Sequence, residues 1–159
     1  MTEILTIAIT GATGFLGRHL VEQARSAGHR VRALTRKPVN AESDSEMTWI
    51  TGTLEDRAAL KTLVAGADVV VHAAGAIKAL SRSAFFHINR DGTEAIAEAA
   101  TAEGVKRFVL VSSLAARAPT LSPYAASKRA AELVVEENAD QLNAIILRPP
   151  AIYGPGDGE

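Results

Sequence analysis

The chain has 159 residues, of which 47% are hydrophobic, 22% are charged and 4% are aromatic, a composition typical of one soluble globular domain. Lys and Arg number 17 against 18 Asp and Glu, and this formal charge of −1 gives no general attraction to nucleic acid or to an anionic membrane. The absence of Cys excludes thiolate catalysis and Cys-ligated metal sites and is consistent with a reducing compartment, so we expect a cytoplasmic protein with a small-molecule ligand.

Short runs rich in β-branched and aliphatic residues alternate with longer, Ala-rich segments of helical periodicity. The predicted strands are Ile4–Thr10, Arg30–Thr35, Met47–Thr51, Asp68–His72, Arg107–Ser112 and Asn143–Arg148. The predicted helices are Phe15–Ala27, Glu55–Val64, Ser83–Glu103 and Pro123–Asn138. The polar segment Val39–Glu46 stays unassigned, and we expect Pro38–Glu46 to form a mobile surface loop.

The segments Val69–Val71 and Phe108–Val111 are apolar at every position. Strands that are buried on both faces belong to parallel sheets covered by helices. The alternation of strands and helices therefore predicts an α/β fold with a doubly wound parallel sheet, a Rossmann fold. We expect about six strands in the order 3-2-1-4-5-6, with helices on both faces of the sheet.

Residues at the predicted helix ends support this assignment. Ser122 precedes Pro123, the pattern of an N-cap followed by proline at the first helical position. Gly28 and Gly104 lie just past two predicted helices, where a left-handed residue often ends a helix. Thr53–Asp56 resembles a capping box, with Thr as the cap and Asp in place of the usual Glu.

A glycine-rich turn follows the first predicted strand and opens the first predicted helix. Such glycines permit a tight turn and a close approach of the backbone to a ligand, and they bring a helix N-terminus to a pyrophosphate. The spacing differs slightly from the G-x-G-x-x-G fingerprint, and a turn without a ligand is the alternative. The candidate cofactor-binding residues are Gly11, Thr13, Gly14, Phe15, Leu16 and Gly17.

The second predicted strand ends with Thr35, followed by Arg36 and Lys37, where sites for NAD place a carboxylate against the ribose hydroxyls. A guanidinium can bind a 2′-phosphate through two hydrogen bonds, whereas a carboxylate repels it. We therefore expect NADP rather than NAD, with Thr35 and Arg36 among its contacts. The alternative is that Arg36 and Lys37 only solvate the start of a loop.

Tyr124 and Lys128 are four residues apart and share one face near the start of a predicted helix. A nearby ammonium lowers the pKa of a phenol, which allows tyrosine to exchange a proton with a substrate oxygen near neutral pH. The alternative is an exposed helix pair without a catalytic role. The preceding strand carries Ser112 and Ser113 to the carboxyl edge of the sheet, beside the expected cofactor crevice, which favours the catalytic interpretation.

Together these motifs resemble the short-chain dehydrogenase/reductase superfamily, specifically its extended, NAD(P)-dependent epimerase/dehydratase-like branch. The matching segments follow in order along nearly the whole chain: Gly11–Gly17, His72–Gly75, Asn89–Thr93, Ser112–Ser113, Tyr124–Lys128, Leu147–Pro149 and Ile152–Gly156. The resemblance implies an enzyme that transfers hydride between a nicotinamide and a carbonyl or hydroxyl substrate, by reduction, oxidation, epimerisation or dehydration. A cofactor sensor and an assembly subunit are the alternatives, but such proteins tend to lose the Tyr/Lys pair.

The resemblance also implies roles for individual residues. Tyr124 would be the general acid/base, Lys128 would lower its pKa and hold the nicotinamide ribose, and Ser113 would hydrogen-bond the substrate oxygen. Further cofactor contacts would come from Thr53, Leu54, Ala73, Ala74, Gly75, Asn89 and Pro149. His72 is left open between a cofactor contact and a hydrogen-bonded residue at a strand end.

The chain departs from the family pattern at two places. Relatives often have Asp after the third strand to meet the adenine amino group, whereas this chain has Gly52 and Thr53. Relatives also continue into a C-terminal substrate-binding region, so residues 1–159 resemble the NAD(P)-binding Rossmann domain of a longer enzyme.

The remaining expectations concern partners, membranes and metals. Small apolar residues on the last two long helices suggest a homodimer, because relatives commonly pair through the corresponding helices: Ala95, Ala99, Ala130 and Ala131. The uncharged stretch Ile4–Gly17 is too short to span a bilayer and lacks the pattern of a signal peptide. His19, His29 and His87 share no ligand spacing, so we expect no metal.

Overall fold

The computed structural model describes residues 3–39 and 46–157. Its six parallel strands form one sheet in the order β3-β2-β1-β4-β5-β6, which confirms the predicted topology. The strands are β1 (Thr6–Thr10), β2 (Arg30–Thr35), β3 (Met47–Thr51), β4 (Val69–His72), β5 (Arg107–Val111) and β6 (Ala144–Leu147). The unassigned segment between β2 and β3, and the loop expected there, lie largely outside the described residues.

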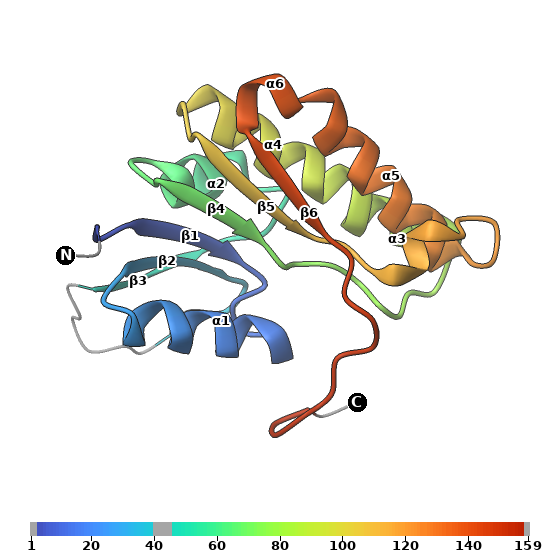
Figure 1. Ribbon diagram of the computed structural model, residues 1–159, viewed down its shortest axis with the longest axis horizontal. Helices are drawn as coiled ribbons and strands as arrows, with labels where there is room; N and C mark the ends of the chain where they lie inside the picture. Colours follow the sequence, from blue (N-terminus) through green and yellow to red (C-terminus); the bar gives the residue numbers. More distant parts are fainter. Residues whose placement is uncertain (1–2, 40–45, 158–159) are drawn as a thin grey trace.

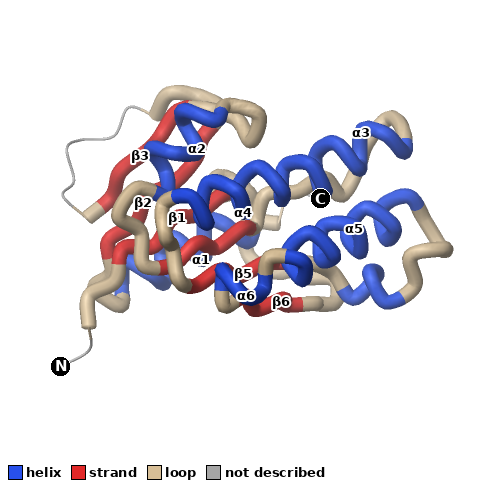
Figure 2. The backbone as a smooth tube through the Cα atoms, turned by 90° about the horizontal axis from the view of Figure 1, so that it is seen from above, coloured by secondary structure: helices blue, strands red, loops and turns tan. Residues whose placement is uncertain are grey.

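Helices cover both faces of the sheet, as predicted (Figure 1). They are α1 (Phe15–Ser26), α2 (Arg57–Val64), α3 (Arg82–Phe86), α4 (Gly92–Ala102), α5 (Pro123–Glu137) and α6 (Ala139–Leu142). Helix α1 lies on one face, and α2, α4 and α5 lie on the other, where Figure 2 shows α4 and α5 seen from above. No helix of the described residues is long and apolar enough to cross a membrane.

The core consists of two apolar clusters, one on each face of the sheet. In β1, Ala8 belongs to the cluster under α2, α4 and α5, whereas Ile9 belongs to the cluster under α1. Successive side chains of a strand point to opposite faces, so both faces of a central strand must be apolar. This two-sided burial explains why these strands read as uninterrupted apolar runs.

The helix predicted over Ser83–Glu103 is interrupted, which corrects the sequence expectation. A π-helical turn over His87–Asp91 separates α3 from α4. The turn holds the Asn89 side chain, which is buried and hydrogen-bonded to the backbone of Ala76. Apolar periodicity continues through such a turn, so the pattern alone did not reveal it.

Three of the predicted helix ends have the expected capping residue, and one does not. The Ser122 hydroxyl accepts a hydrogen bond from the Ala125 N–H at 3.0 Å, and Gly28 and Gly104 have φ of +80° and +70°. The capping box at the start of α2 is wrong, because Asp56 is the N-cap and accepts from Ala59 N–H at 2.9 Å. A carboxylate caps a helix N-terminus well, so α2 begins at residue 57, two residues later than predicted.

Candidate functional site

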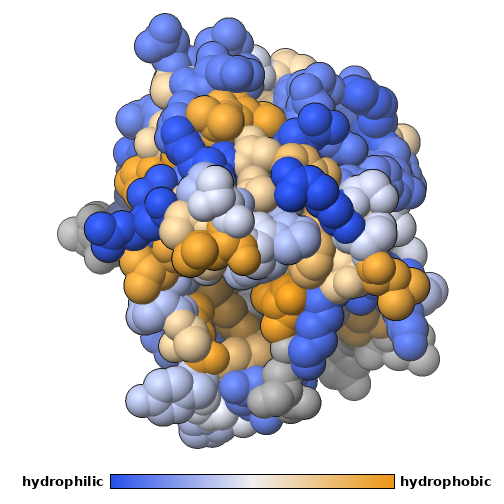
Figure 3. All heavy atoms as spheres, turned by 90° about the vertical axis from the view of Figure 1, so that its right-hand side faces the viewer, coloured by the Kyte–Doolittle hydropathy of each residue, from blue (hydrophilic) through white to orange (hydrophobic). Residues whose placement is uncertain are grey.

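A cleft of about 1220 Å³ opens at the carboxyl edge of the sheet. Its walls come from the loops that follow β1, β4, β5 and β6 and from the first turns of α5. Strands β1 and β4 are neighbours, and the strand order reverses between them, which is where open α/β sheets bind their ligands. Figure 3 shows apolar side chains around a hollow on the side of the molecule where this edge lies. The cleft is therefore at the place that the fold favours for a nucleotide.

The predicted site residues divide into two groups. Those that line the cleft are Gly14, Phe15, Leu16, Ala73, Gly75, Ser113, Tyr124, Lys128 and Pro149. Those outside its lining are Gly11, Thr13, Gly17, Thr35, Arg36, Thr53, Leu54, Ala74 and Asn89. The first group comes from separate parts of the chain, so the fold brings together the glycine turn and the Tyr/Lys pair.

The glycine turn is packed so closely that two of its positions leave no room for a side chain. Gly11 has φ of +72°, and a Cβ there would lie 2.6 Å from the backbone nitrogen of Ala74. A Cβ on Gly17 would overlap the carbonyl oxygen of Gly11. The turn therefore rests on the loop after β4 and on its own helix, and both contacts require glycine.

Helix α1 begins at this turn without a side-chain cap. Its N-cap is Gly14, and its first turn has no acidic residue, whereas side chains cap α2, α3 and α5. The residues at this end, Gly14, Phe15 and Leu16, line the cleft. N–H groups at a helix start attract an anion when no side chain satisfies them. This arrangement fits the pyrophosphate of a dinucleotide.

Lys128 is only 6% exposed and forms part of the cleft wall on α5. Its Nζ donates a hydrogen bond to the carbonyl oxygen of Val111 at 2.8 Å. Burial lowers the pKa of Lys128 to about 8, and the negative charge of Glu132 opposes this effect. A Cβ on Gly75 would lie 3.6 Å from Nζ, so the loop after β4 passes directly over the ammonium group.

Tyr124 precedes Lys128 by about one helical turn and is half-buried in the same cleft wall. The ring of Phe85 meets the tyrosine ring edge-on, with centroids 6.0 Å apart. Ser113 faces the cleft from the end of β5, and its hydroxyl accepts from the N–H of Ala115 at 3.2 Å. A serine oxygen used as an acceptor keeps its own hydrogen free for a ligand. The Tyr124 phenol, the Lys128 ammonium and the Ser113 hydroxyl thus share the cleft.

Asn89 supports the cleft from behind rather than from its wall. Its Oδ1 accepts from Ala76 N–H at 2.7 Å, and its Nδ2 donates to Ser127 Oγ at 2.9 Å. The Ser127 hydroxyl in turn donates to the carbonyl oxygen of Tyr124 at 2.8 Å. The π-helical turn therefore connects the loop after β4 to the start of α5.

His72 is fully buried at the end of β4. The Thr93 hydroxyl donates to the Asn89 carbonyl at 2.6 Å, so at 3.0 Å it accepts from His72 Nε2–H. Nδ1 then accepts from the Thr10 hydroxyl at 2.6 Å. Burial, together with the charge of Lys128, lowers the pKa of His72 to about 3. His72 is a neutral, hydrogen-bonded residue at a strand end, one of the two alternatives left open by the sequence.

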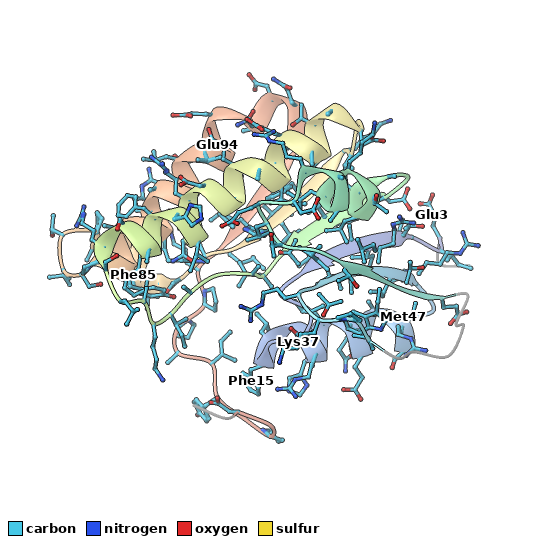
Figure 4. All side chains as sticks on the ribbon, turned by 180° about the vertical axis from the view of Figure 1, so that it is seen from behind. Glu3, Phe15, Lys37, Met47, Phe85 and Glu94 are labelled. Carbon is cyan, nitrogen blue, oxygen red and sulfur yellow. The ribbon has the colours of Figure 1, made fainter. Side chains whose placement is uncertain are left out.

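The expected adenine and phosphate contacts lie at the far end of the edge, outside the cleft lining. Arg36 is exposed directly after β2, and the Thr35 hydroxyl bonds the carbonyl of Lys37 at 2.8 Å. In Figure 4, Lys37 marks the end of β2 and Phe15 the beginning of α1, both at the edge where the strands end. Leu54 packs against the core and against Gly92 rather than into the cleft.

Sequence reasoning missed an ion cluster beside the cleft, in which the buried Glu132 is paired with the partly exposed Arg148 and Arg129. The available signal was the position of Glu132, four residues after Lys128 and eight after Tyr124, on the same face of α5. Among the described residues, no group of three or more His, Asp or Glu side chains could hold a metal ion.

The structure is that of an α/β protein with a doubly wound parallel sheet, a cleft at the carboxyl edge and a Tyr/Lys pair in the cleft wall. The sequence model of the NAD dependent epimerase/dehydratase family matches residues 7–159, and the chain belongs to this family. It is similar to a ceramide reductase of Caulobacter vibrioides, with 55% identity over 155 residues, 96% of this chain and 48% of the relative. It is also similar to a Stigmatella aurantiaca ketoreductase of a farnesylated dihydroquinoline oxide, with 36% identity over 94% of this chain and 51% of that protein.

Solved structures share the fold. A short-chain dehydrogenase/reductase superfamily protein of Agrobacterium tumefaciens, solved with bound NAD, has 29% identity and a TM-score of 0.77. The match covers 90% of this chain and 48% of that one. The chain thus spans about half the length of the relatives it matches.

Proposed function

We propose that this protein is part of an NAD(P)-dependent oxidoreductase that acts on a carbonyl or hydroxyl group with Tyr124, Lys128 and Ser113. The observation that carries the proposal is the buried Lys128 in a cleft wall shared with Tyr124 and Ser113. Burying an ammonium group costs folding free energy, and residues with strongly perturbed pKa values are concentrated at functional sites. Family membership supports the same reading.

Each group of the site has a separate role in the proposed reaction. The uncapped start of α1 and Lys128 would hold a nicotinamide cofactor, which would supply or accept hydride when bound. Tyr124 gives a proton to the substrate oxygen during reduction and takes one during oxidation. Lys128, as a cation, stabilises the phenolate of Tyr124, and the free hydroxyl hydrogen of Ser113 orients the substrate oxygen.

Substitution of Tyr124 by Phe tests the proposal in the full-length protein. Loss of the proton donor should lower turnover by roughly 10²–10⁴-fold. NADPH binding, followed by nucleotide fluorescence, should barely change, because the ring and its contact with Phe85 remain. Turnover at the wild-type rate in Tyr124→Phe would remove the catalytic assignment and favour a cofactor sensor.

We further infer that NADP is preferred over NAD. Arg36 lies exposed at the end of β2, where a guanidinium can meet a 2′-phosphate, and β2 is not followed by a carboxylate at positions 36–39.

We also infer a cytoplasmic homodimer. Its surface would include the outer faces of α4 and α5, where Leu133 is 44% exposed. Ala131, placed in that surface by the sequence, is instead fully buried in the core.

The substrate is proposed to be apolar around its reactive oxygen. Exposed apolar side chains line the cleft from three loops: Ile77, Leu114, Leu121, Ile152 and Tyr153. Of the described lining residues, only Lys128 and Arg18 are cations, and Arg18 belongs to α1. A nucleoside-diphosphate substrate would call for additional cations. The names of the relatives above, a ceramide reductase and a ketoreductase of a farnesylated ring, support the same class.

A substrate comparison on the full-length protein tests this class. NADPH consumption should be faster with long-chain ketones than with short-chain ketones that have the same reactive group. Oxidised sugar nucleotides should give little consumption. A preference for the sugar nucleotide would refute the proposal of an apolar substrate and would leave the catalytic assignment of Tyr124 unaffected.

A further inference from the structure

Glu132 is a fully buried carboxylate that accepts four hydrogen bonds. Ser112 Oγ donates to its Oε1 at 2.5 Å, and Arg148 Nε donates to the same oxygen at 2.8 Å. Arg148 Nη2 and Arg129 Nη1 donate to Oε2 at 2.6 and 3.0 Å. Both oxygens are thus satisfied, and the hydrogen bonds keep the pKa of Glu132 below its usual value against the opposing effect of burial.

The partners of Glu132 come from three segments that form one wall of the cleft. Ser112 directly precedes Ser113, and Arg148 directly precedes Pro149, both of which line the cleft. Glu132 itself lies on α5, about one turn beyond Lys128. The two loops are also joined through their backbones, because Leu114 N–H donates to the carbonyl of Pro149 at 2.9 Å. One carboxylate therefore connects the loop after β5, the segment after β6 and the helix that carries Tyr124.

Such an arrangement is poorly explained by stability alone. Glu132 is fully buried, whereas the side chains of Arg129 and Arg148 are 30% and 38% exposed. Taking a carboxylate out of water is costly, and a well-packed apolar side chain of similar volume often serves stability as well or better. Unlike apolar packing, the hydrogen bonds of an ion cluster are directional, so a bidentate guanidinium and a serine hydroxyl each fix the orientation of the segments that they join. The cluster holds the loop after β5 and the segment after β6 at defined positions against α5.

Glu132 also sets the charge near Lys128. Electrostatic partners of Lys128 are His72 at the end of β4 and Glu132 on α5, and Glu132 is itself paired with Arg129 and Arg148. The cleft that Lys128 lines also contains Tyr124, Arg18 and Asp157. His72 is neutral because its pKa is about 3, and its partners are hydroxyl groups. The hydrogen bonds of Glu132 keep its pKa below the usual value, and its negative charge raises the pKa of Lys128 against the effect of burial.

We propose that Glu132 is a positioning residue of the site: through Ser112 and Arg148 it aligns Ser113 and the Pro149 segment with Tyr124, and it places a negative charge about one helical turn from Lys128. This role rests on the proposed function. Glu132 does not line the cleft, so it is expected to act through the residues that do.

Glu132→Gln, which keeps the size of the side chain and removes its charge, provides the main test in the full-length protein. We expect turnover to fall roughly 10–100-fold, because small misplacements of a reacting group have effects of this size. The KM for NADPH should change less than turnover, because the glycine turn makes no hydrogen bond with the cluster, whereas Lys128 and the Pro149 segment are expected cofactor contacts. The basic limb of the pH–rate profile should move to lower pH, because Lys128 loses its neighbouring charge. Wild-type turnover with an unmoved profile overturns the proposal.

Two further variants make the result interpretable. Glu98→Gln breaks an exposed ion pair with Arg57 and should behave as wild type in every measurement. Ser112→Ala removes one of the four hydrogen bonds and leaves the charge paired, so it should lower turnover without moving the pH profile. If Glu132→Gln does not fold, wild-type turnover in Ser112→Ala overturns the positioning role.

The pKa of Lys128, measured by NMR in cofactor-free protein, separates this inference from the proposed function. It should fall in Glu132→Gln and stay unchanged in Glu98→Gln. A wild-type protein that reduces no carbonyl compound refutes the proposed function, yet the NMR result still decides whether Glu132 controls Lys128. An unchanged Lys128 pKa overturns that part of the inference.

Discussion

Lys128→Met should make the protein more stable at neutral pH while abolishing its activity. Burial lowers the pKa of Lys128 from 10.5 to about 8, which corresponds to roughly 3 kcal/mol of destabilisation below pH 8. Methionine fills a similar volume without a charge. Methionine cannot donate the hydrogen bond that Lys128 makes to the Val111 carbonyl, and this loss reduces the gain in stability by about 1 kcal/mol. We therefore expect a net gain of about 2 kcal/mol at pH 7.

The pH dependence identifies the cause of this gain. Because the unfolded chain holds the Lys128 proton up to pH 10.5 and the folded chain releases it near pH 8, wild-type stability should rise between these values. The advantage of Lys128→Met should therefore shrink from pH 8 to 10.5. Urea unfolding of both proteins without cofactor, at several pH values, measures the difference. A variant that is less stable than wild type at pH 7, or an advantage independent of pH, would refute the reasoning.

Three other predictions concern the cofactor, a buried histidine and association. Arg36→Asp should abolish or reverse a preference for NADPH over NADH, and equal affinities of the wild type for both, titrated at fixed ionic strength, would contradict the assignment. His72 has a folded pKa of about 3 against 6.5, so stability should fall as the pH drops from 6.5 toward 3; His72→Gln should flatten this part of the pH–stability curve, and an unchanged slope would speak against the buried neutral state. Light scattering on the full-length protein at micromolar concentration should give the mass of a dimer, and Leu133→Glu on α5 should shift it toward a monomer; a monomeric wild type would exclude the proposed pairing.

The sequence alone determined the architecture because the signals for it are local. Two-sided apolar runs such as Val69–Val71 identify buried parallel strands, and the glycines from Gly11 to Gly17 mark a turn whose backbone contacts exclude side chains. The alternation of strand and helix predicts a parallel sheet, because parallel strands need crossover connections of fixed hand. The glycine turn after the first strand favours the order that the structure has, β3-β2-β1-β4-β5-β6. The Tyr124 and Lys128 pair could be found because its spacing lies within one helix.

The tertiary structure decided what depends on contacts between distant segments. Glu132 meets Ser112 and Arg148 only after β5, β6 and α5 have packed together, and no local pattern encodes that meeting. The π-helical turn at Asn89 is stabilised by hydrogen bonds to the loop after β4 and to Ser127 on α5. Because these partners are distant in the sequence, the local helical periodicity did not reveal the interruption. The low pKa of Lys128 likewise arises from burial, which is a property of the packed chain and not of the residue or its neighbours in sequence.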